Sequence, residues 1–320
     1  MNVSFQYRGM VLCPYTCSDV RTSDWPSFAK AAGLNLLGIH NGGGDEHARR
    51  ADLHLAACGA NQRDGLVRRT MEAGLDVEYE LHAMSTLLPR SEFRRNPSWF
   101  LHDYWQGKRI PDFNFCPHSR PAMERVALNA RRLGRRYHPT TGRYFLWSDD
   151  GRYWCHCDHC RSLSNSDQEL LVMNALLKAI RRDRADARLA YLAFMGTMDP
   201  PSSVKPAAGV FLEYAPYKRC FRHSIDDPHC SVNLRNWNAL LRLLKVFDPR
   251  ECHVLEYWLD ELYIGKNKEV IVPVMRKDLR AYAGLGIRSV TSFATFDPKR
   301  RLGRKDLQAI RRYGEAVSAV

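Results

Sequence analysis

Short apolar segments recur along the chain, each bounded by glycine, proline or polar residues. Runs of this length, rich in aliphatic and aromatic residues, are typical of strands that are buried on both faces. The sequence predicts eight such strands, at residues 10–14, 34–41, 76–82, 144–149, 189–194, 210–214, 254–259 and 287–293. Within 76–82, Glu78, Glu80 and His82 share one face, because side chains alternate along a strand.

Segments with apolar residues at helical spacing separate most of these strands. Ser166 and Glu169 have the spacing of a capping box at the start of one of them. The connection between the fifth and sixth strands is rich in proline and is predicted to lack a full helix. The predicted helices lie at residues 25–31, 65–73, 121–136, 166–182, 234–247, 272–283 and 305–317.

Eight strands that alternate with helices predict a parallel sheet, and over this length they favour a closed barrel. The predicted fold is therefore α/β, a (β/α)8 TIM barrel that forms a single domain over residues 1–320. Two connections stand apart from this pattern. One is an irregular insertion at about 85–120, and the other is a Cys-rich loop at 151–165.

Carboxylates and aromatic residues gather where the predicted strands end, which is where TIM barrels carry their catalytic groups. Paired carboxylates serve glycoside hydrolysis, one as acid and one as base or nucleophile, and aromatic rings suit sugar faces. The candidate catalytic residues are Asp149, Asp150, Glu213 and Glu256. The candidate substrate-binding residues are His40, Asn41, Glu80, His82, Tyr214, Tyr257, Trp258 and Asp260.

Each of these residues also has a structural interpretation. Asp149 and Asp150 precede Gly151 and would also suit a turn. Glu213 and Glu256 lie inside apolar strands, where a carboxylate needs a partner, so a salt bridge to a buried arginine is the alternative. Trp258 could simply fill the core. Glu78 lies nearer the start of its strand and is predicted to be a structural partner.

Three thiols follow the fourth predicted strand in the pattern C-x-C-x-x-C, namely Cys155, Cys157 and Cys160. Structural zinc takes four ligands, and Cys116 in the preceding insertion is the first choice for the fourth, with a local histidine as the second. The sequence thus predicts a structural zinc site. Thiols that stay reduced or form disulfides are the main alternative, and a catalytic metal is the third.

Composition limits the classes of partner. The 320 residues include no apolar run of the roughly 20 residues that a membrane helix needs, and the first residues lack the apolar core of a signal peptide. Cytoplasmic localisation, no membrane and reduced thiols are therefore expected. The formal charge of +13 favours an anionic partner, with solvated helix faces as the alternative. No nucleic-acid-binding module accompanies the charge.

Several motifs resemble those of β-N-acetylhexosaminidases. The Arg8-Gly9 opening of the first strand, the second strand ending at His40, and the segments 78–82 and 147–150 are similar to theirs. The chain resembles more closely a bacterial family of glycoside-hydrolase-like barrels of unknown function. The motifs that carry this resemblance are Asp149-Asp150 followed by the Cys motif, the helix that contains Asn174, and the segments at residues 211–216 and 254–260.

This resemblance implies roles for three residues. Arg8 would bind sugar hydroxyls, Asp149 would orient a substrate group, and Asp150 would be the general acid, although it is one methylene shorter than the glutamate of hexosaminidases. We therefore expect a glycoside hydrolase for an acidic or acetamido sugar, without an organic cofactor. A saccharide-binding barrel without activity and a metal-dependent hydrolase or lyase are the alternatives.

Overall fold

The computed structural model describes residues 4–13, 24–41, 65–151, 153–264, 271–296 and 302–320. Eight parallel strands close into a barrel in the order β1-β10-β9-β8-β7-β6-β3-β2. They are β1 (Tyr7–Leu12), β2 (Leu36–His40), β3 (Asp76–His82), β6 (Arg143–Trp147), β7 (Arg188–Ala193), β8 (Val210–Tyr214), β9 (His253–Glu256) and β10 (Ser289–Ala294). Each strand pairs with its neighbours in the chain, and β1 pairs with β10 to close the barrel.

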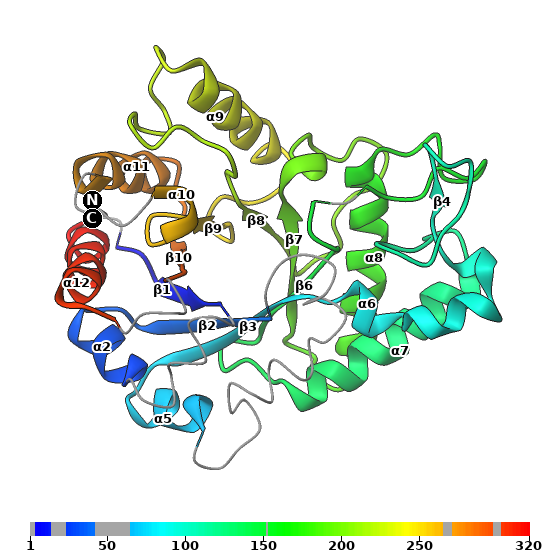
Figure 1. The fold of residues 1–320 in the computed structure, drawn as a ribbon, viewed down its shortest axis with the longest axis horizontal. Coiled ribbons are helices and arrows are strands. Elements are labelled where there is room, and N and C mark those ends of the chain that lie inside the picture. The colour runs from blue at the N-terminus through cyan, green and yellow to red at the C-terminus, as the bar shows by residue number, and fades with distance from the viewer. Residues whose placement is uncertain (1–3, 14–23, 42–64, 152, 265–270, 297–301) are drawn as a thin grey trace.

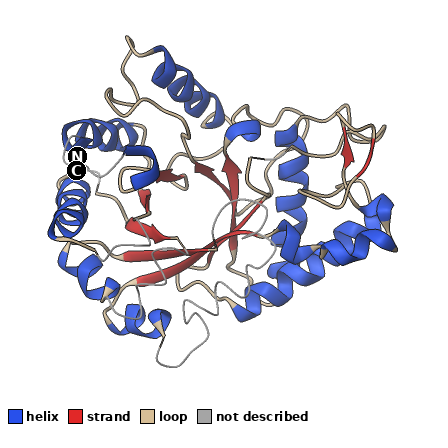
Figure 2. Cartoon of the chain, viewed as in Figure 1, coloured by secondary structure: helices blue, strands red, loops and turns tan. Residues whose placement is uncertain are grey.

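Helices surround the strands, as Figures 1 and 2 show. In the part of the chain that the structure describes, the longer helices are α2 (Trp25–Ala31), α5 (Leu66–Glu72), α7 (Arg120–Arg136), α8 (Asn165–Ile180), α9 (Ser231–Leu243), α11 (Val272–Gly284) and α12 (Arg304–Ser318). Short helices α6 (Met84–Leu87) and α10 (Glu261–Ile264) follow β3 and β9. The prediction of a single-domain (β/α)8 barrel is confirmed.

Side-chain alternation sorts the barrel wall into two cores. The inner core fills the barrel with residues such as Val11, Phe145, Phe211, Leu255 and Phe293. The outer core is larger and packs the other face of each strand against the helices. Because both faces of each strand are buried against apolar residues, the strands appear in the sequence as nearly continuous hydrophobic runs.

The predicted irregular insertion contains short regular elements besides α6. Two 3-10 helices, η1 (Arg90–Arg94) and η2 (Pro97–Trp99), lead into an antiparallel pair formed by β4 (His102–Asp103) and β5 (Lys108–Arg109). The backbone N–H of His156 donates to the His102 carbonyl at 3.0 Å. The insertion is thus fastened to the Cys-rich loop.

Helix α8 begins differently from the prediction. Its N-cap is Ser164, whose hydroxyl oxygen accepts from the Asp167 N–H at 3.0 Å. The proposed capping box of Ser166 and Glu169 is therefore wrong, because both residues lie inside the helix and are buried. The connection from β7 to β8 holds only the 3-10 helix η3 (Met195–Thr197), so the predicted lack of a full helix there is confirmed.

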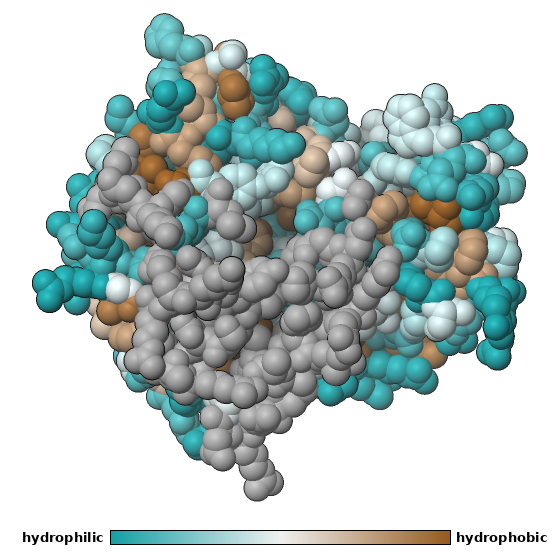
Figure 3. Space-filling view, in the orientation of Figure 1, coloured by the Kyte–Doolittle hydropathy of each residue, from teal (hydrophilic) through white to brown (hydrophobic). Residues whose placement is uncertain are grey.

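Most of the surface that is coloured in Figure 3 is hydrophilic, with small scattered apolar areas. Among the described residues no helix is both long and apolar enough to cross a bilayer.

Candidate functional site

An aromatic cluster lines the barrel where β2, β3 and β6 end. The rings of His40, His82 and Trp147 lie with centroids 5.2–5.3 Å apart in every pair. His40 Nδ1 is 2.6 Å from the Glu80 carbonyl oxygen, and His82 Nδ1 is 2.7 Å from that of Ser148. A carbonyl can only accept, so both Nδ1 atoms carry the proton, and in a neutral ring Nε2 is then an acceptor.

Asn41 holds this part of the mouth together. Its side chain accepts from the His82 N–H at 3.0 Å and donates to the His82 carbonyl at 3.3 Å. The predicted binding residues His40, Asn41 and His82 are therefore neighbours at one side of the barrel.

The adjacent acids after β6 have different surroundings. Asp149 is buried and forms an ion pair with Arg90 of η1. Its backbone N–H also donates to Asn114 Oδ1 at 2.9 Å. Asp150 is half-buried and has no hydrogen-bond partner among the described residues. Two consecutive carboxylates thus have one member fixed by a cation and one without such a partner.

Asp260 comes from the loop after β9 and lies near the same two phenols as Asp150. Burial raises the pKa of Tyr217 and of Tyr257, and the negative charges of Asp150 and Asp260 raise both further. The two rings lie 6.0 Å apart. Asp260 itself accepts a hydrogen bond from the Thr295 hydroxyl.

Another polar layer lies deeper in the barrel. Glu78 accepts two bonds from Arg143 at 2.7 and 2.9 Å, which confirms its predicted structural role. One carboxylate oxygen from each of Glu80 and Glu213 lies within 4.8 Å of the other and of a His253 nitrogen. Burial is the first cause that raises the pKa of both carboxyls well above the ordinary value, which favours their protonated forms.

This deep pair is separated from the mouth by Trp147, whose indole N–H donates to Glu213 at 2.6 Å. Glu80 and Glu213 are both fully buried. Of the predicted site residues, these two face the barrel interior but lie one layer below the strand ends.

Three predicted site residues face away from the barrel interior. Glu256 accepts bonds from Arg219 and from the Tyr282 hydroxyl, both at 2.6 Å. Tyr214 donates to the Asn236 carbonyl of α9, and Trp258 donates to Asp278 of α11. All three belong to the layer between the barrel and its helices, so the structure does not bring them to the mouth.

Arg8 is also remote from the strand ends. It is the second residue of β1, and its guanidinium donates to the carbonyls of Gly33 and Phe5 at 2.8 and 3.2 Å. These contacts lie at the N-terminal end of the barrel. The role that the hexosaminidase resemblance implies for Arg8 has no support in this geometry.

A cleft of about 420 Å³ is lined in part by Gly151, the residue after Asp150, and the sequence interpretation missed most of its lining. Tyr217 and Lys218 follow β8, and Met195 follows β7. The position of these loops after strand ends could have indicated them, because such loops build TIM-barrel sites, but the residues that line the cleft include no acid or histidine. The other lining residues are Gly151, Tyr153, Asn165, Gly196, Met198 and Asn236.

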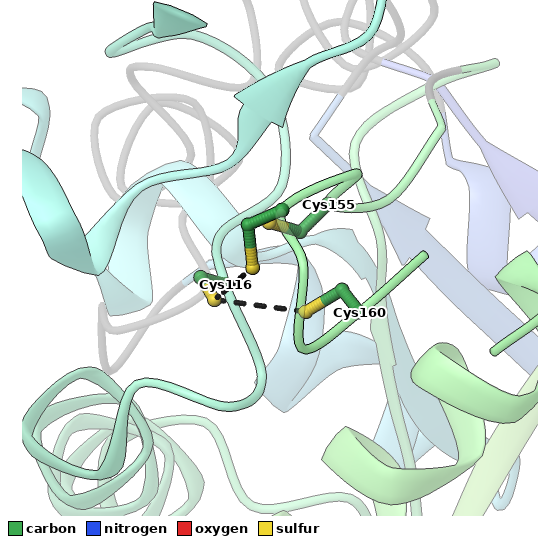
Figure 4. A group of neighbouring side chains, drawn as sticks. Cys116, Cys155 and Cys160 are labelled. Carbon is green, nitrogen blue, oxygen red and sulfur yellow. Dashed lines mark hydrogen bonds between the residues drawn. The ribbon is translucent and has the colours of Figure 1, made fainter. Parts of the chain in front are cut away.

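The four predicted metal ligands come together in one buried cluster. The sulfur atoms of Cys116, Cys155, Cys157 and Cys160 all lie within 4.8 Å of one another. Cys116 Sγ is 3.8 Å from that of Cys157 and 3.7 Å from that of Cys160. Figure 4 shows Cys116 from the insertion meeting the thiols of the Cys-rich loop. A buried set of four thiols can bind a metal ion.

Nitrogen donors surround the cluster. The His102 N–H and Arg109 Nη1 lie 3.3 and 3.4 Å from Cys155 Sγ, and His118 Nδ1 lies 3.2 Å from Cys160 Sγ. The thiols of Cys155 and Cys160 and the Arg109 guanidinium hold the pKa of Cys116 well below its usual range. Thiolate, the form that binds metal, is therefore favoured at Cys116, whereas the hydrogen bonds with Cys116 raise the pKa of Cys155 and of Cys160 above the usual range.

Three polar side chains connect the cluster to the acids after β6. Asn114 accepts from the Asp149 N–H and donates to the Tyr153 carbonyl at 3.1 Å. Gln168 of α8 accepts from the Cys155 N–H at 3.1 Å and donates back to the Cys155 carbonyl at the same distance. The Cys-rich loop therefore positions the acidic loop through defined hydrogen bonds.

Glu169 is the third connecting residue, and sequence reasoning gave it only a capping role. It is fully buried, and it accepts from the Trp154 indole at 3.0 Å. Burial raises the pKa of Glu169 to about 7, against hydrogen bonds from Ser148 and Trp154 that lower it. Glu169 thus links α8 to the residue immediately before Asp149.

The fold and mouth define a (β/α)8 barrel with carboxylates and aromatic rings at its strand ends. A family model described as a domain of unknown function (DUF4838) matches residues 40–310, and the chain belongs to that family. No curated protein matches the sequence.

Solved structures with the same fold include several glycoside hydrolases. A GH42 beta-galactosidase from G. stearothermophilus is 11% identical, with a TM-score of 0.59 over 98% of this chain and 56% of the other. This chain therefore spans little more than half of that enzyme. A GH5-4 broad specificity endoglucanase from Bacteroides salanitronis is 9% identical, with a TM-score of 0.53 over 92% and 85% of the two chains.

A third structure contains the GH20 catalytic modules of the pneumococcal exo-beta-D-N-acetylglucosaminidase StrH. It is 8% identical, with a TM-score of 0.53 over 98% of this chain and 83% of the other. At such identities the likeness concerns the fold, and function must be argued from the site.

Proposed function

We propose that the protein is a glycoside hydrolase in which Asp150 is the general acid and Asp260 is the partner carboxylate. The observation that carries the proposal is that these two acids follow different strands, β6 and β9, and that both raise the pKa of Tyr217 and Tyr257, whose rings lie 6.0 Å apart. Two carboxylates that flank a common space are what glycoside hydrolysis requires. The fold of the barrel, which glycoside hydrolases of three families share, supports the same reaction.

Differences in surroundings assign the roles. Arg90 keeps Asp149 ionised, so Asp149 is suited to orient a substrate hydroxyl rather than to donate a proton. The Thr295 hydroxyl bonds to Asp260 and favours its carboxylate form. Asp150 has neither an ion pair nor a hydroxyl donor among the described residues, which leaves its carboxyl free to contact the glycosidic oxygen, so we assign it the role of general acid.

In the proposed reaction, the Asp150 carboxyl gives its proton to the glycosidic oxygen while the bond from that oxygen to the anomeric carbon breaks. The negative charge of Asp260 stabilises the oxocarbenium-like transition state. Water then supplies the new oxygen on the anomeric carbon and releases a proton to a carboxylate. His40, Asn41 and His82 are proposed to contact sugar hydroxyls at the side of β2 and β3.

An acidic sugar is the proposed substrate class. Lys218 lines the cleft, with Nζ 5.5 Å from the centre of the Tyr217 ring. A cation in the cleft would pair with a sugar carboxylate, and the formal charge of +13 would attract such a substrate. Lys218 has φ of +59°, a conformation that lysine seldom adopts, so the fold holds this residue in an unusual geometry.

The proposal is tested by hydrolysis of aryl glycosides of neutral, acetamido and acidic sugars. Asp150→Asn and Asp260→Asn should each lower kcat/KM for the accepted class by about 10²- to 10⁴-fold. Asp226→Asn is the matched control, since Asp226 is exposed and has no hydrogen bond to the described residues. Its activity should equal that of the unchanged protein.

Absence of turnover on all three classes by folded protein would contradict the proposal. Saccharide binding without turnover would then indicate a binding barrel. Product stereochemistry, followed by NMR, distinguishes retention from inversion in an active enzyme.

We further propose that the four-cysteine cluster holds structural zinc. Four bonds of about 2.3 Å in a tetrahedron place the sulfur atoms about 3.8 Å apart. The separations of 3.7 and 3.8 Å from Cys116 match this value, whereas a disulfide would require about 2.05 Å. Four protein ligands would close the coordination sphere, so the proposed role is to brace the two loops that carry Asn114 and Asp149.

Metal analysis of the purified protein tests the zinc proposal. Cys116→Ser should lose one equivalent of tightly bound zinc and unfold at a lower temperature. Cys13→Ser is a matched control, since Cys13 is buried in the barrel core and not in the cluster. Zinc that stays bound in Cys116→Ser would contradict the assignment.

A further inference from the structure

The loop between β8 and α9 brings together a second group of metal-ligand side chains. Cys220, His223 and Cys230 each offer one ligand atom, and these atoms lie within 4.8 Å of one another. Cys220 is half-buried, His223 is exposed and Cys230 is buried. None of the three belongs to the mouth or to the four-cysteine cluster.

The spacing of these atoms fits a tetrahedral ion. Zinc bonds of about 2.3 Å to sulfur and 2.0–2.1 Å to nitrogen place the two ligands about 3.5 Å apart. Cys220 Sγ and His223 Nδ1 are 3.4 Å apart. The second sulfur comes from Cys230, the N-cap residue of α9, and completes one face of a tetrahedron.

The loop is fixed in this shape before any ion binds. Asn233 of α9 is fully buried and accepts from the Cys220 N–H at 2.8 Å. It also donates to the carbonyls of Cys220, His223 and Ser224 at 2.9–3.0 Å. One amide therefore ties down the backbone on both sides of two ligands, which lowers the entropy cost of ion binding.

A buried ion-pair network supports the same loop from below. Arg219 Nη2 donates to the His223 carbonyl at 3.0 Å. The same guanidinium bonds to Glu256 at 2.6 Å and to Asp278 at 2.8 Å. Asp278 also accepts from the Ile225 N–H at 2.6 Å. The residues next to the ligands are thus anchored to β9 and α11.

We propose that Cys220, His223 and Cys230 form a second zinc site with its fourth position open to solvent. Two thiolates and an imidazole are a ligand set that selects thiophilic ions, of which zinc is the proposed occupant. The exposure of His223 leaves room for water as the fourth ligand. The four-cysteine cluster differs, because its four protein ligands are all buried.

The site would stabilise the wall of the cleft. Tyr217 and Lys218 line the cleft and come directly before Arg219 and Cys220. An ion on Cys220 would therefore restrain the segment that carries Tyr217 and Lys218. The metal site itself does not depend on the proposed hydrolase activity.

Equilibrium dialysis against buffered free zinc, with the metal counted by mass spectrometry, tests the site. His223→Ala should bind one equivalent less than the unchanged protein, with an affinity at this site lower by about 100-fold or more, which exceeds the usual effect of losing an outer contact. His229→Ala is the matched control, because His229 is also exposed and close in sequence but is not in the cluster. It should bind as much zinc as the unchanged protein.

The readout is a difference of one equivalent, so it is independent of whether the four-cysteine cluster is filled. Cys220→Ser should show the same loss as His223→Ala. Equal zinc binding by His223→Ala and the unchanged protein would overturn the proposal. A disulfide between Cys220 and Cys230, found by thiol counting in protein purified under reducing conditions, would overturn it as well.

Discussion

The loop after β6 and the end of β9 both carry carboxylates beside aromatic residues, yet the structure uses them in opposite ways. Asp149 and Asp150 come after Trp147, the last residue of β6, and belong to the mouth. Glu256 is the last residue of β9 and faces outward. The comparison shows that an acid at a strand end serves the mouth only if it lies on the inner face or past the strand.

Glu256 belongs to a buried ion-pair network rather than to the mouth. Arg219 lies between Glu256 and Asp278, and all three side chains are fully buried. Burial raises the pKa of Asp278 to about 6 against the pull of Arg219, and the charge of Glu256 adds to the rise. The network fastens β9, α11 and the loop before α9 to one another.

The acids after β6 are held by a different kind of framework. Arg90, Asn114 and Glu169 come from three separate parts of the chain, and they contact Asp149, the Asp149 N–H and Ser148 respectively. Asp150 is left without such a contact among the described residues. A loop held by hydrogen bonds, with Asp150 as the one acid that has no ion pair among the described residues, is the arrangement expected for a proton donor.

The largest expected effect on stability comes from the outward acid. Glu256→Ala removes one of the two buried carboxylates that pair with Arg219 and the acceptor of the buried Tyr282 hydroxyl, and should lower the free energy of unfolding by about 3–5 kcal/mol. Urea denaturation followed by circular dichroism measures it. Glu315→Ala removes an exposed partner of Arg312 and should cost less than about 0.5 kcal/mol.

The comparison would fail if Glu256→Ala folded with normal stability and lost all activity. Glu256 would then act at the mouth, despite its outward contacts.

A pH effect of intermediate size is expected from Glu169. Its pKa in the folded protein is about 7, above the ordinary 4.5, so the native state binds more protons between these pH values. The contribution of Glu169 to the free energy of unfolding is therefore fully present below pH 4.5 and is lost as the pH rises through 7. The free energy of unfolding should fall by about 3 kcal/mol over this range because of this one group. Glu169→Gln should remove this part of the pH dependence.

Unfolding free energies at several pH values between 4 and 8, taken as the difference between the variant and the unchanged protein, isolate the contribution of Glu169. Glu124→Gln, at an exposed position on α7, should give a flat difference. A flat difference for Glu169→Gln as well would show that the carboxyl titrates normally.

The smallest effect on stability is expected at Asn114. This residue tests most directly whether the side chains that hold the loop after β6 position its acids. Asn114→Ala leaves the Asp149 N–H and the Tyr153 carbonyl without this partner and should cost about 1–3 kcal/mol. If the framework positions the acids, kcat should fall about tenfold while KM changes little. Asn174→Ala removes a similar amide bridge, to Lys205 and Ala207, away from the mouth and should leave kcat unchanged.

The sequence by itself determined the barrel and the four-cysteine cluster. The order of apolar runs and helices leaves few other topologies, because parallel strands need a crossover and pair with their neighbours in the chain. The thiols of Cys155, Cys157 and Cys160 are so close in sequence that any compact loop brings them together. Cys116 was the one ligand that needed a long-range inference, and the insertion does carry it to the cluster.

Only the tertiary structure decided which strand residues face the interior. Alternation requires that Glu213 and Tyr214, or Glu256 and Tyr257, face opposite ways, but strands buried on both faces show no polar side that would identify the inner set. Packing decided three positions. Glu213 is buried beneath Trp147, Glu256 pairs with Arg219 on the outer face, and Arg8 lies at the N-terminal end of β1. The group of Cys220, His223 and Cys230 likewise depends on the fold of one loop, which Asn233 and Arg219 hold in place.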